Sequence, residues 1–252
     1  MASKYDKYIT QILELHDENL SNADIGRTLG IDSRRVSGIL RKRGMSGHGK
    51  TFKGSPTPLQ HEYFVANAIG DGSIFKSKEN TNYRMNLAHS LEQKDYFIMK
   101  YEAVKDFINV DYTLESRFDK RTKKTYSYLK YQTRVHPYFT ELHNQWYQNG
   151  SPIIRDENAD QLTARVLSYL YFDDGNKTNY GMSIAVSNYD LNSIKNIIER
   201  MSEVFGVEAN WQKSGNIYIP AKRAQRFADG VRPYATNDDL YKLGEFSGTP
   251  NV

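Results

Sequence analysis

The chain of 252 residues has no cysteine, and its 6 histidines are scattered. The lack of thiols excludes disulfides, thiolate zinc sites and cysteine nucleophiles. No two histidines stand at metal-ligand spacing beside a third ligand, so a zinc site is not expected. A run of about 18 apolar residues is also missing, and no basic-then-apolar leader begins the sequence. We therefore expect a cytoplasmic protein without a membrane span or secretory signal.

Positive charge is in excess only near the N-terminus. Residues 1–58 hold 10 Lys and Arg against 6 Asp and Glu, whereas the remainder holds 24 of each sign. Residues 33–53 contain seven basic side chains and no acid. Such a segment suits a polyanion such as a nucleic-acid backbone, although a solvated surface is the ordinary explanation of a charge run alone.

The segment before this basic run has the pattern of a helix-turn-helix. Residues 5–19 predict a helix, and Ile25 and Leu29 place an apolar pair on the next one. Gly30 permits a tight turn, and Val36 and Ile39 repeat the apolar face on a second helix. In that geometry the second helix enters the major groove of DNA. A small helical module for protein contacts is the alternative.

This interpretation assigns DNA contacts by position along the second helix and beyond. Its first residues face base edges, namely Ser33, Arg34, Arg35 and Ser37. Its last residues touch phosphates, namely Arg41, Lys42 and Arg43. Residues 44–58 are rich in Gly, Ser and Pro and predict a linker. Lys50 and Lys53 would follow the DNA backbone there, and a simple tether between two modules is the alternative.

Two acidic-glycine pairs, Asp71-Gly72 and Asp174-Gly175, each end a short apolar run, and the second lies 103 residues after the first. A helix C-terminus carries about −0.5 charge, so a carboxylate there is disfavoured unless a cation neutralises it. Two such ends brought together would form an acidic pocket that needs divalent metal. A single Asp-Gly pair is commonly just a helix stop, so the recurrence is what favours a functional site.

The order of predicted elements repeats after the linker. The first half predicts a helix over 59–70, a strand over 83–88, a helix over 92–107, and strands over 113–118 and 125–135. The second half predicts a helix capped by Asn158 and reaching 172, a strand over 182–186, a helix over 191–205, and strands near 208–212 and 216–219. Residues 88–110 align with 185–207 without a gap, and their apolar stripes coincide. The sequence therefore predicts a duplicated unit.

The two Asp-Gly runs resemble the paired motifs of LAGLIDADG homing endonucleases. Residues 218–234 and the segment Leu240-Tyr-Lys-Leu243 resemble the C-terminal strand, helix and closing segment of that family. The likeness covers about residues 58–243. It implies an α+β fold of two pseudo-symmetric αββαββα repeats that form a DNA-binding saddle, here preceded by the all-α helix-turn-helix. The expected domains are 1–46, a linker over 47–57, and repeats over 58–150 and 151–252, the second with a mobile tail.

The resemblance also implies the chemistry and its residues. Asp71 and Asp174, the last Asp of each motif, would share two or more Mg²⁺ ions that activate water and stabilise the leaving oxygen. Gly70 and Asp173, which precede these acids, join the candidate metal residues. The family adds a basic residue in each half near the scissile phosphates. The candidates are Lys130 or Arg134 in the first half and Lys213 or Lys222 in the second.

Outward-alternating strand residues would read the DNA. In the first half these are Arg84, Asn86, Arg117, Lys120, Arg121, Lys123, Lys124 and Gln132. In the second half they are Lys177, Ser183, Asn210, Gln212 and Asn216.

Taken together, the residues and the resemblance predict a monomeric, magnesium-dependent, site-specific endonuclease that cuts double-stranded DNA for intron homing in a bacterial or phage host. Two other functions stay open: an intron-RNA maturase, and a transcriptional regulator that binds DNA without cutting it. The presence of both Asp71 and Asp174 favours the nuclease, because a pure binder has no reason to bear the electrostatic cost of converging carboxylates.

Overall fold

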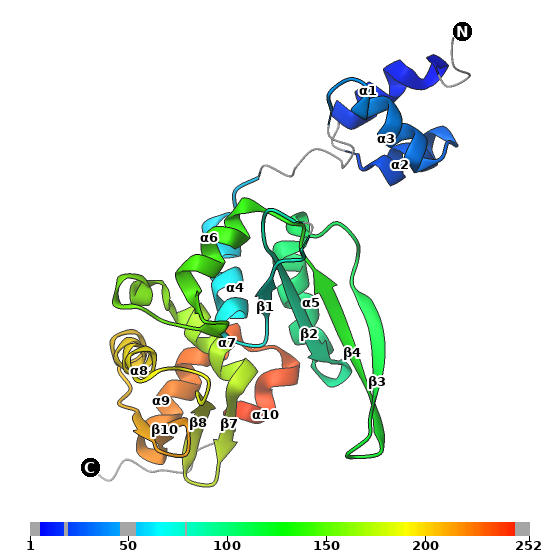
Figure 1. Ribbon diagram of the computed structural model, residues 1–252. Helices are drawn as coiled ribbons and strands as arrows, with labels where there is room; N and C mark the ends of the chain where they lie inside the picture. Colours follow the sequence, from blue (N-terminus) through cyan, green and yellow to red (C-terminus); the bar gives the residue numbers. More distant parts are fainter. Residues whose placement is uncertain (1–5, 18–19, 46–53, 79, 245–252) are drawn as a thin grey trace. The chain divides into compact units, whose positions relative to one another are not determined.

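The computed structural model describes residues 6–17, 20–45, 54–78 and 80–244 (Figure 1). The chain divides into two compact units, residues 1–55 and 56–252. Lys50, Lys53 and the predicted mobile tail after Gly244 lie outside the described residues. No helix of the described residues is long and apolar enough to cross a membrane.

The described part of the N-terminal unit contains three α-helices: α1 (Ile9–Asp17), α2 (Asn22–Leu29) and α3 (Ser33–Arg41). The side chains of Ser21 and Asp32 cap α2 and α3 by accepting backbone N–H groups of the first turn. The buried core consists of Ile12, Ile25, Val36 and Leu40. The two predicted helices and the glycine turn between them are therefore present.

Two glycines set the angle between α2 and α3. Gly30 ends α2 with a φ of 65°, in the left-handed region that glycine adopts without strain. Gly26 faces the turn, and a Cβ at this position would lie 2.7 Å from the carbonyl oxygen of Ile31. Because the obstacle is backbone, a larger residue at position 26 would push the two helices apart.

The first half of the C-terminal unit has the order helix, two strands, helix, two strands, helix. Its elements are α4 (Pro58–Ile69), β1 (Ser73–Phe75), β2 (Arg84–Ser90), α5 (Lys94–Val104), β3 (Thr113–Asp119), β4 (Lys124–Gln132) and α6 (Pro137–Trp146). The strands are antiparallel neighbours in the order β1-β2-β4-β3. Thr57 and Gln60 form a capping box at the start of α4.

The second half repeats this order. Its elements are α7 (Ala164–Asp174), β7 (Gly175–Thr178), β8 (Gly181–Ala185), α8 (Leu191–Phe205), β9 (Asn210–Gln212), β10 (Asn216–Pro220) and α9 (Ala221–Val231). The sheet order β7-β8-β10-β9 matches that of the first half. The duplicated α+β unit predicted from the sequence is confirmed. A two-stranded ribbon of β5 (Tyr147–Gln148) and β6 (Ser151–Pro152) stands between the halves.

Two predicted helix boundaries differ from the structure. The helix expected to begin at Asn158 begins at Ala164, capped by Thr163. Asn158 lies in a 3₁₀ segment (Asp156–Gln161), where its side chain accepts from the N–H of Arg155 at 2.9 Å and donates to the carbonyl of Gln145 at 3.0 Å. The asparagine thus satisfies loop backbone instead of a helix start. The helix predicted over 92–107 is also shorter, because its two ends are 3₁₀ turns.

The helices α4 and α7 lie side by side in the middle of the C-terminal unit (Figure 1). Every residue from 63 to 69 in α4 and from 166 to 172 in α7 is buried. A helix buried on all sides has no single apolar face, so its partners cannot be read from periodicity. The hydroxyl of Tyr169 donates to that of Tyr63 at 3.0 Å and joins the two helices.

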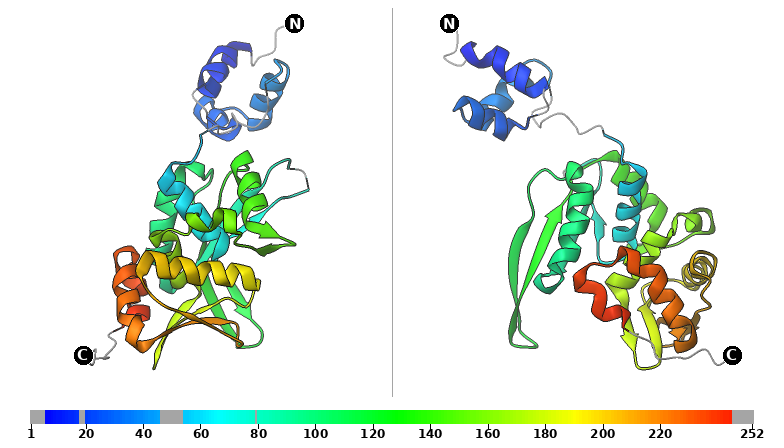
Figure 2. Two further views of the ribbon diagram at one scale, coloured as in Figure 1. Left: turned by 90° about the vertical axis from the view of Figure 1, so that its left-hand side faces the viewer. Right: turned by 180° about the vertical axis from the view of Figure 1, so that it is seen from behind.

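The closing segment of the chain lies at the junction of the halves. It consists of the 3₁₀ turn Asn237–Asp239 and α10 (Leu240–Leu243). The turn packs on α5 of the first half and α10 on β7 of the second, an arrangement visible from the front in Figure 1 and from behind in Figure 2. A lysine from this segment, Lys242, is thereby buried near the ends of α4 and α7.

Gly26→Ala should destabilise the N-terminal unit by about 1–3 kcal/mol through overpacking against the turn. Gly38→Ala, in α3, is the matched control, since a Cβ there meets nothing within 4 Å. It should stabilise the same unit by about 0.5–1 kcal/mol. Amide hydrogen exchange of residues 20–45 measures both effects. Equal responses to the two substitutions would contradict the packing described for Gly26.

Candidate active site

Asp71 and Asp174 occupy equivalent places in the two halves. Asp71 follows the end of α4 by two residues, and Asp174 is the last residue of α7. Because the two helices pack along each other, their ends meet. The negative charge of Asp71 is one of the main influences on the pKa of Asp174, so the two carboxylates lie within electrostatic reach. The structure therefore brings the two predicted acids together.

Side chains bind the last carbonyl groups of both helices, which would otherwise lack partners. The hydroxyl of Tyr147 donates to the carbonyl of Ala68 at 2.8 Å, and that of Tyr189 donates to the carbonyl of Ile69. The ammonium of Lys242 donates to the carbonyl of Phe172. Tyr189 belongs to the second half, so its bond ties the end of α4 to the opposite repeat.

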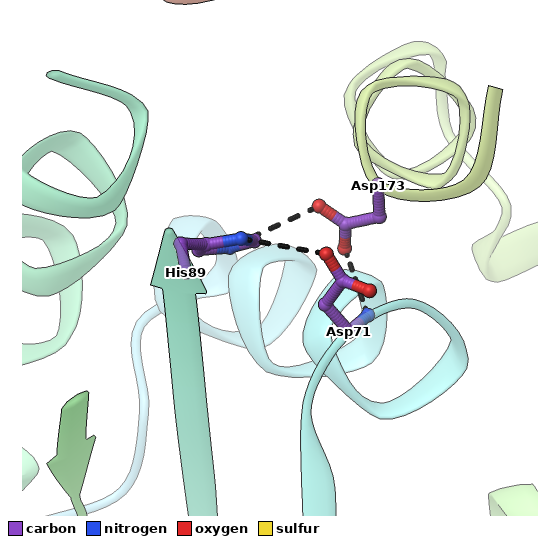
Figure 3. Close-up of side chains that lie close together, drawn as sticks. All are labelled: Asp71, His89 and Asp173. Atoms are coloured by element: carbon purple, nitrogen blue, oxygen red, sulfur yellow. Dashed lines mark hydrogen bonds and ion pairs between the residues drawn. The ribbon is translucent and has the colours of Figure 1, made fainter. Parts of the chain in front are cut away.

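Asp71 contacts Asp173 and His89, and part of its side chain is exposed to solvent. Its backbone N–H donates to Oδ2 of Asp173 at 3.0 Å, and its own Oδ2 lies 3.4 Å from Nδ1 of His89 (Figure 3). Its side chain is still 38% exposed. Burial opposes ionisation of this carboxyl, but the hydrogen bond and charge of His89 and the charges of Lys100 and Lys242 outweigh it, so the pKa of Asp71 is lowered.

Asp173 forms a buried ion pair with Lys100 of α5. The ammonium of Lys100 lies 2.8 Å from Oδ1 and 3.0 Å from Oδ2 of Asp173, and both side chains are 0% exposed. The hydroxyl of Tyr96 donates to Oδ1 at 2.8 Å. Each oxygen of Asp173 therefore already accepts two hydrogen bonds. A buried pair of this kind is costly to break, because the remaining partner becomes an uncompensated charge.

Asp174 has the opposite environment. Burial raises the pKa of Asp174 to about 7, and the negative charges of Asp71 and Asp173 add to this effect. The charges of Lys242 and Lys100 reduce it only in part. Within the part of the chain that the structure describes, no hydrogen bond or ion pair reaches this carboxylate. Asp174 is a site that a divalent cation would stabilise.

The donor set fits a hard divalent ion held by Asp71 and Asp174. Asp71, His89 and Asp173 also place one ligand atom each within 4.8 Å of one another. Asp173 is poorly suited to join, because it would have to release Lys100. Among the described residues, Oδ1 of Asp71 and both oxygens of Asp174 accept no hydrogen bond. Carboxylate oxygens of this kind are the ligands that Mg²⁺ prefers. Gly70, the other predicted metal residue, borders Asp173 at the end of α4.

The four predicted basic residues occupy varied positions. Lys130 lies on β4, where its ammonium is 3.8 Å from Glu115. Arg134 follows the end of β4, Lys213 is exposed between β9 and β10, and Lys222 is exposed on α9. None of them is among the main charges acting on Asp71 or Asp174.

The two lysines that do act on the acids, Lys100 and Lys242, were missed by the sequence reasoning. Lys100 lies in a helix and resembles a surface residue in sequence, yet it is fully buried. Lys242 lies in the closing segment, where burial lowers its pKa and the four nearby aspartates oppose that effect. One signal was available for Lys242, since it stands between Tyr241 and Leu243 in a segment that resembles the family.

The outer face of the first sheet carries most of the predicted DNA contacts. Asn86 pairs with Gln132, and Arg117 pairs with Tyr126, so the register places these side chains on the face opposite the buried Leu87 and Leu129. Arg84 shares this face by alternation. The turn between β3 and β4, together with the first residue of β4, adds four exposed lysines and arginines: Lys120, Arg121, Lys123 and Lys124.

The second sheet presents a polar outer face in the same way. Tyr218 pairs with both Ser183 and Asn210, and Asn216 pairs with Gln212, which places the predicted contacts on one face of the sheet. Ser183 itself is buried, and its hydroxyl donates to Oδ1 of Asn176 at 2.6 Å. Lys177 differs, because it pairs with the buried Met182 and so lies on the opposite face from Ser183. Its neighbour Asn176 pairs with Ser183 and occupies the position expected for a contact.

The helix α3 of the N-terminal unit exposes the predicted arginines. Arg34, Arg35 and Arg41 are exposed, and Ser33 begins the helix. The guanidinium of Arg34 donates to the carboxylate of Asp32 at 3.1 and 2.9 Å. This interaction and the backbone N–H of Arg34 lower the pKa of Asp32 to about 2. In the free protein Arg34 is therefore held at the start of the helix.

The pKa of Asp174 predicts a pH-dependent stability. A folded pKa of about 7, above the ordinary 3.8, means that the folded state favours the protonated carboxyl. The protonated carboxyl therefore contributes to the unfolding free energy. This contribution is fully present below about pH 4 and is lost as the pH rises to about 7, and it amounts to about 1.4 kcal/mol for each unit of pKa difference. Relative to Asp174→Asn, metal-free wild type should therefore lose unfolding free energy between pH 4.5 and 7.5.

Urea unfolding followed by tryptophan fluorescence measures this effect in the C-terminal unit alone, because both tryptophans, Trp146 and Trp211, lie there. Asp229→Asn, at an exposed carboxylate on α9, is the matched control and should follow wild type. Parallel curves for wild type and Asp174→Asn would contradict the prediction.

Known proteins resemble this chain over most of its length. The chain is 25% identical over 225 residues to probable intron-encoded endonuclease 1 of Wickerhamomyces canadensis, covering 81% of this chain and 96% of that protein. It is 23% identical over 193 residues to cytochrome b mRNA maturase bI2 of Debaryomyces hansenii, covering 73% of each.

Among solved structures, the chain is similar to the homing endonuclease I-WcaI bound to its DNA recognition sequence. The TM-score is 0.66 at 22% identity, over 75% of this chain and 88% of that one. This likeness confirms the fold. Residues 68–227, which include Asp71 and Asp174 and exclude the N-terminal unit, match the LAGLIDADG DNA endonuclease family. The chain therefore belongs to the LAGLIDADG DNA endonuclease family.

Proposed function

We propose that this protein is a site-specific DNA endonuclease that makes metal-dependent double-strand breaks at one long target, as in intron homing. The observation that carries the proposal is the meeting of Asp71 and Asp174 at equivalent ends of two adjacent helices. Two acids in two equivalent repeats suit a substrate with two equivalent strands. The names of two similar proteins, an intron-encoded endonuclease and a homing endonuclease bound to DNA, agree with this function.

In this proposal Asp71 and Asp174 hold two or more divalent ions, with Mg²⁺ as the natural choice for oxygen ligands. Bound there, such ions supply an activated water and stabilise charge on the scissile phosphate and the leaving oxygen. Lys242 lies beside both acids and offsets their mutual repulsion. The outer sheet faces and the basic turn between β3 and β4 bind the duplex.

The N-terminal unit gives the protein a second DNA contact. In a helix-turn-helix, the exposed start of α3 enters the major groove, and the basic end of that helix contacts phosphates. We propose that this unit binds double-stranded DNA beyond the segment read by the two sheets, so that it extends the target. A monomer is sufficient for this scheme, because one chain carries both repeats.

A maturase activity is the second candidate. It is favoured by the relative named as a cytochrome b mRNA maturase, which is similar over 73% of this chain. The polar sheet faces would then bind folded intron RNA. Splicing of the host intron in the presence of the protein tests this function separately from DNA cleavage.

Asp71→Asn and Asp174→Asn should each reduce double-strand cleavage by at least about 100-fold, because each removes a carboxylate that holds the metal. The substrate is a supercoiled plasmid that carries the insertion locus of the gene without the insertion. Agarose gels measure nicked and linear products with and without Mg²⁺. Asp229→Asn is the control and should cut like wild type. Cleavage by both Asn variants would refute the assigned roles, and DNA binding without any cleavage would favour a regulator.

Arg41→Ala, at the end of α3, should weaken binding to all DNA sequences and reduce the slope of log affinity against log salt by about one unit. Arg35→Ala, near the start of α3, should instead relax the sequence preference at one position of the target, at a cost of about 1–3 kcal/mol. Binding in Ca²⁺ at several salt concentrations measures both. Unchanged binding in both variants would indicate a protein-contact role for the N-terminal unit.

A further inference from the structure

We infer that Asp173, Lys100 and His89 form a network between the two halves that positions Asp71 and leaves Asp174 to be positioned independently. These three residues are called the positioning network below. The inference rests on the proposed function and deepens it, because it assigns the role of the residue that precedes the second acid. In this role Asp173 is a positioning residue and not a metal ligand.

The network holds Asp71 at two points, both drawn in Figure 3. Asp173 reaches across from α7 and accepts the backbone N–H of Asp71 at 3.0 Å. His89, on β2, places Nδ1 at 3.4 Å from Oδ2 of Asp71. One contact orients the backbone where α4 ends, and the other orients the carboxylate. The remaining oxygen, Oδ1, is left for metal.

Lys100 contacts His89 as well as Asp173. Its ammonium lies 3.4 Å from Nε2 of His89. Nε2 also lies 4.0 Å from Oδ1 of Asp173, and Nδ1 of the same ring faces Oδ2 of Asp71 (Figure 3). The ring of His89 is therefore placed between Asp71 on one side and Lys100 and Asp173 on the other.

Gly70 makes room for this arrangement. It stands at the motif position that Asp173 occupies in the second half, directly before the acid. A Cβ on Gly70 would overlap the carboxylate of Asp173. The pair Gly70 and Asp173 is therefore complementary: one repeat contributes the side chain, and the other contributes the space that it fills.

The network has no counterpart in the second half. In the gapless alignment of 88–110 with 185–207, His89 corresponds to Val186 and Lys100 to Ile197. Both counterparts are buried and apolar, so they cannot form hydrogen bonds with Asp174. Loss of the positioning network should therefore slow cleavage of the DNA strand that depends on Asp71 more than cleavage of the DNA strand that depends on Asp174.

The first experiment needs no DNA. Hydrogen exchange of the Asp71 amide is measured by NMR in wild type and with Asp173 replaced by Ala or by Asn, each substitution being made together with Lys100→Met so that no buried lysine is left unpaired. Exchange should be at least about tenfold faster in the Ala variant, because a hydrogen bond to a charged acceptor is lost. The Asn variant keeps an oxygen at this place and should show a smaller increase. Unchanged exchange in the Ala variant would overturn the inference, whether or not the protein cuts DNA.

The second experiment measures the rate at which each DNA strand of the plasmid substrate is cut. The double variant Lys100→Met/Asp173→Asn avoids an unpaired buried charge and so keeps the protein folded, as checked by tryptophan fluorescence. It should cut one DNA strand at least about tenfold more slowly, because small displacements of a catalytic group lower the rate strongly. Nicked circular plasmid should therefore accumulate. Lys195→Met removes an exposed lysine paired with Glu199 at 3.6 Å and is the matched control.

The outcomes separate the two proposals. Equal slowing of both strands in the folded double variant would refute positioning of Asp71 and indicate a purely structural role. If wild type itself cuts nothing while the Ala variant loses protection at the Asp71 amide, the proposed nuclease function fails and the positioning of Asp71 stands.

Discussion

The packing of α4 against α7 is the constraint on which the C-terminal unit depends. It brings together two helix C-termini, each partly negative, and the carboxylates of Asp71, Asp173 and Asp174. This concentration of negative charge would oppose folding if it were left alone. The protein offsets part of it with two buried lysines, Lys100 and Lys242, and part with tyrosine hydroxyls that bind the terminal carbonyls.

The compensation is uneven, and this unevenness gives the two acids different properties. Lys100 pairs with Asp173, whose carboxylate accepts the backbone N–H of Asp71. Burial opposes ionisation of Asp71, but His89 and the charges of Lys100 and Lys242 outweigh it and lower the pKa of Asp71. Asp174 has no comparable partner among the described residues, and its pKa is raised to about 7. A fold with near-symmetric repeats thus contains an asymmetric centre. Because the negative charge of Asp174 is not fully compensated by the protein, a divalent cation fits the proposed site.

Local rules predicted most of the elements. The repeated order of helices and strands appears as two sheets of identical connectivity, and Ser21, Asp32 and Thr57 are side-chain caps in the structure. Asn158 shows where such rules fail. An asparagine can cap a helix or bind loop backbone, and the carbonyl of Gln145, which is distant in sequence, decides between the two.

For the candidate site, the sequence determined the two acids, because a duplicated motif places Asp71 and Asp174 at equivalent helix ends, and it determined the alternating polar faces of the sheets. Only the tertiary structure decided the electrostatics around them. Lys100, Asp173 and Lys242 come from three separate elements, and nothing in their local patterns distinguishes a buried ion pair from solvated surface charges. Burial and the distance between charges arise from packing across the two halves, and they set the pKa of each acid.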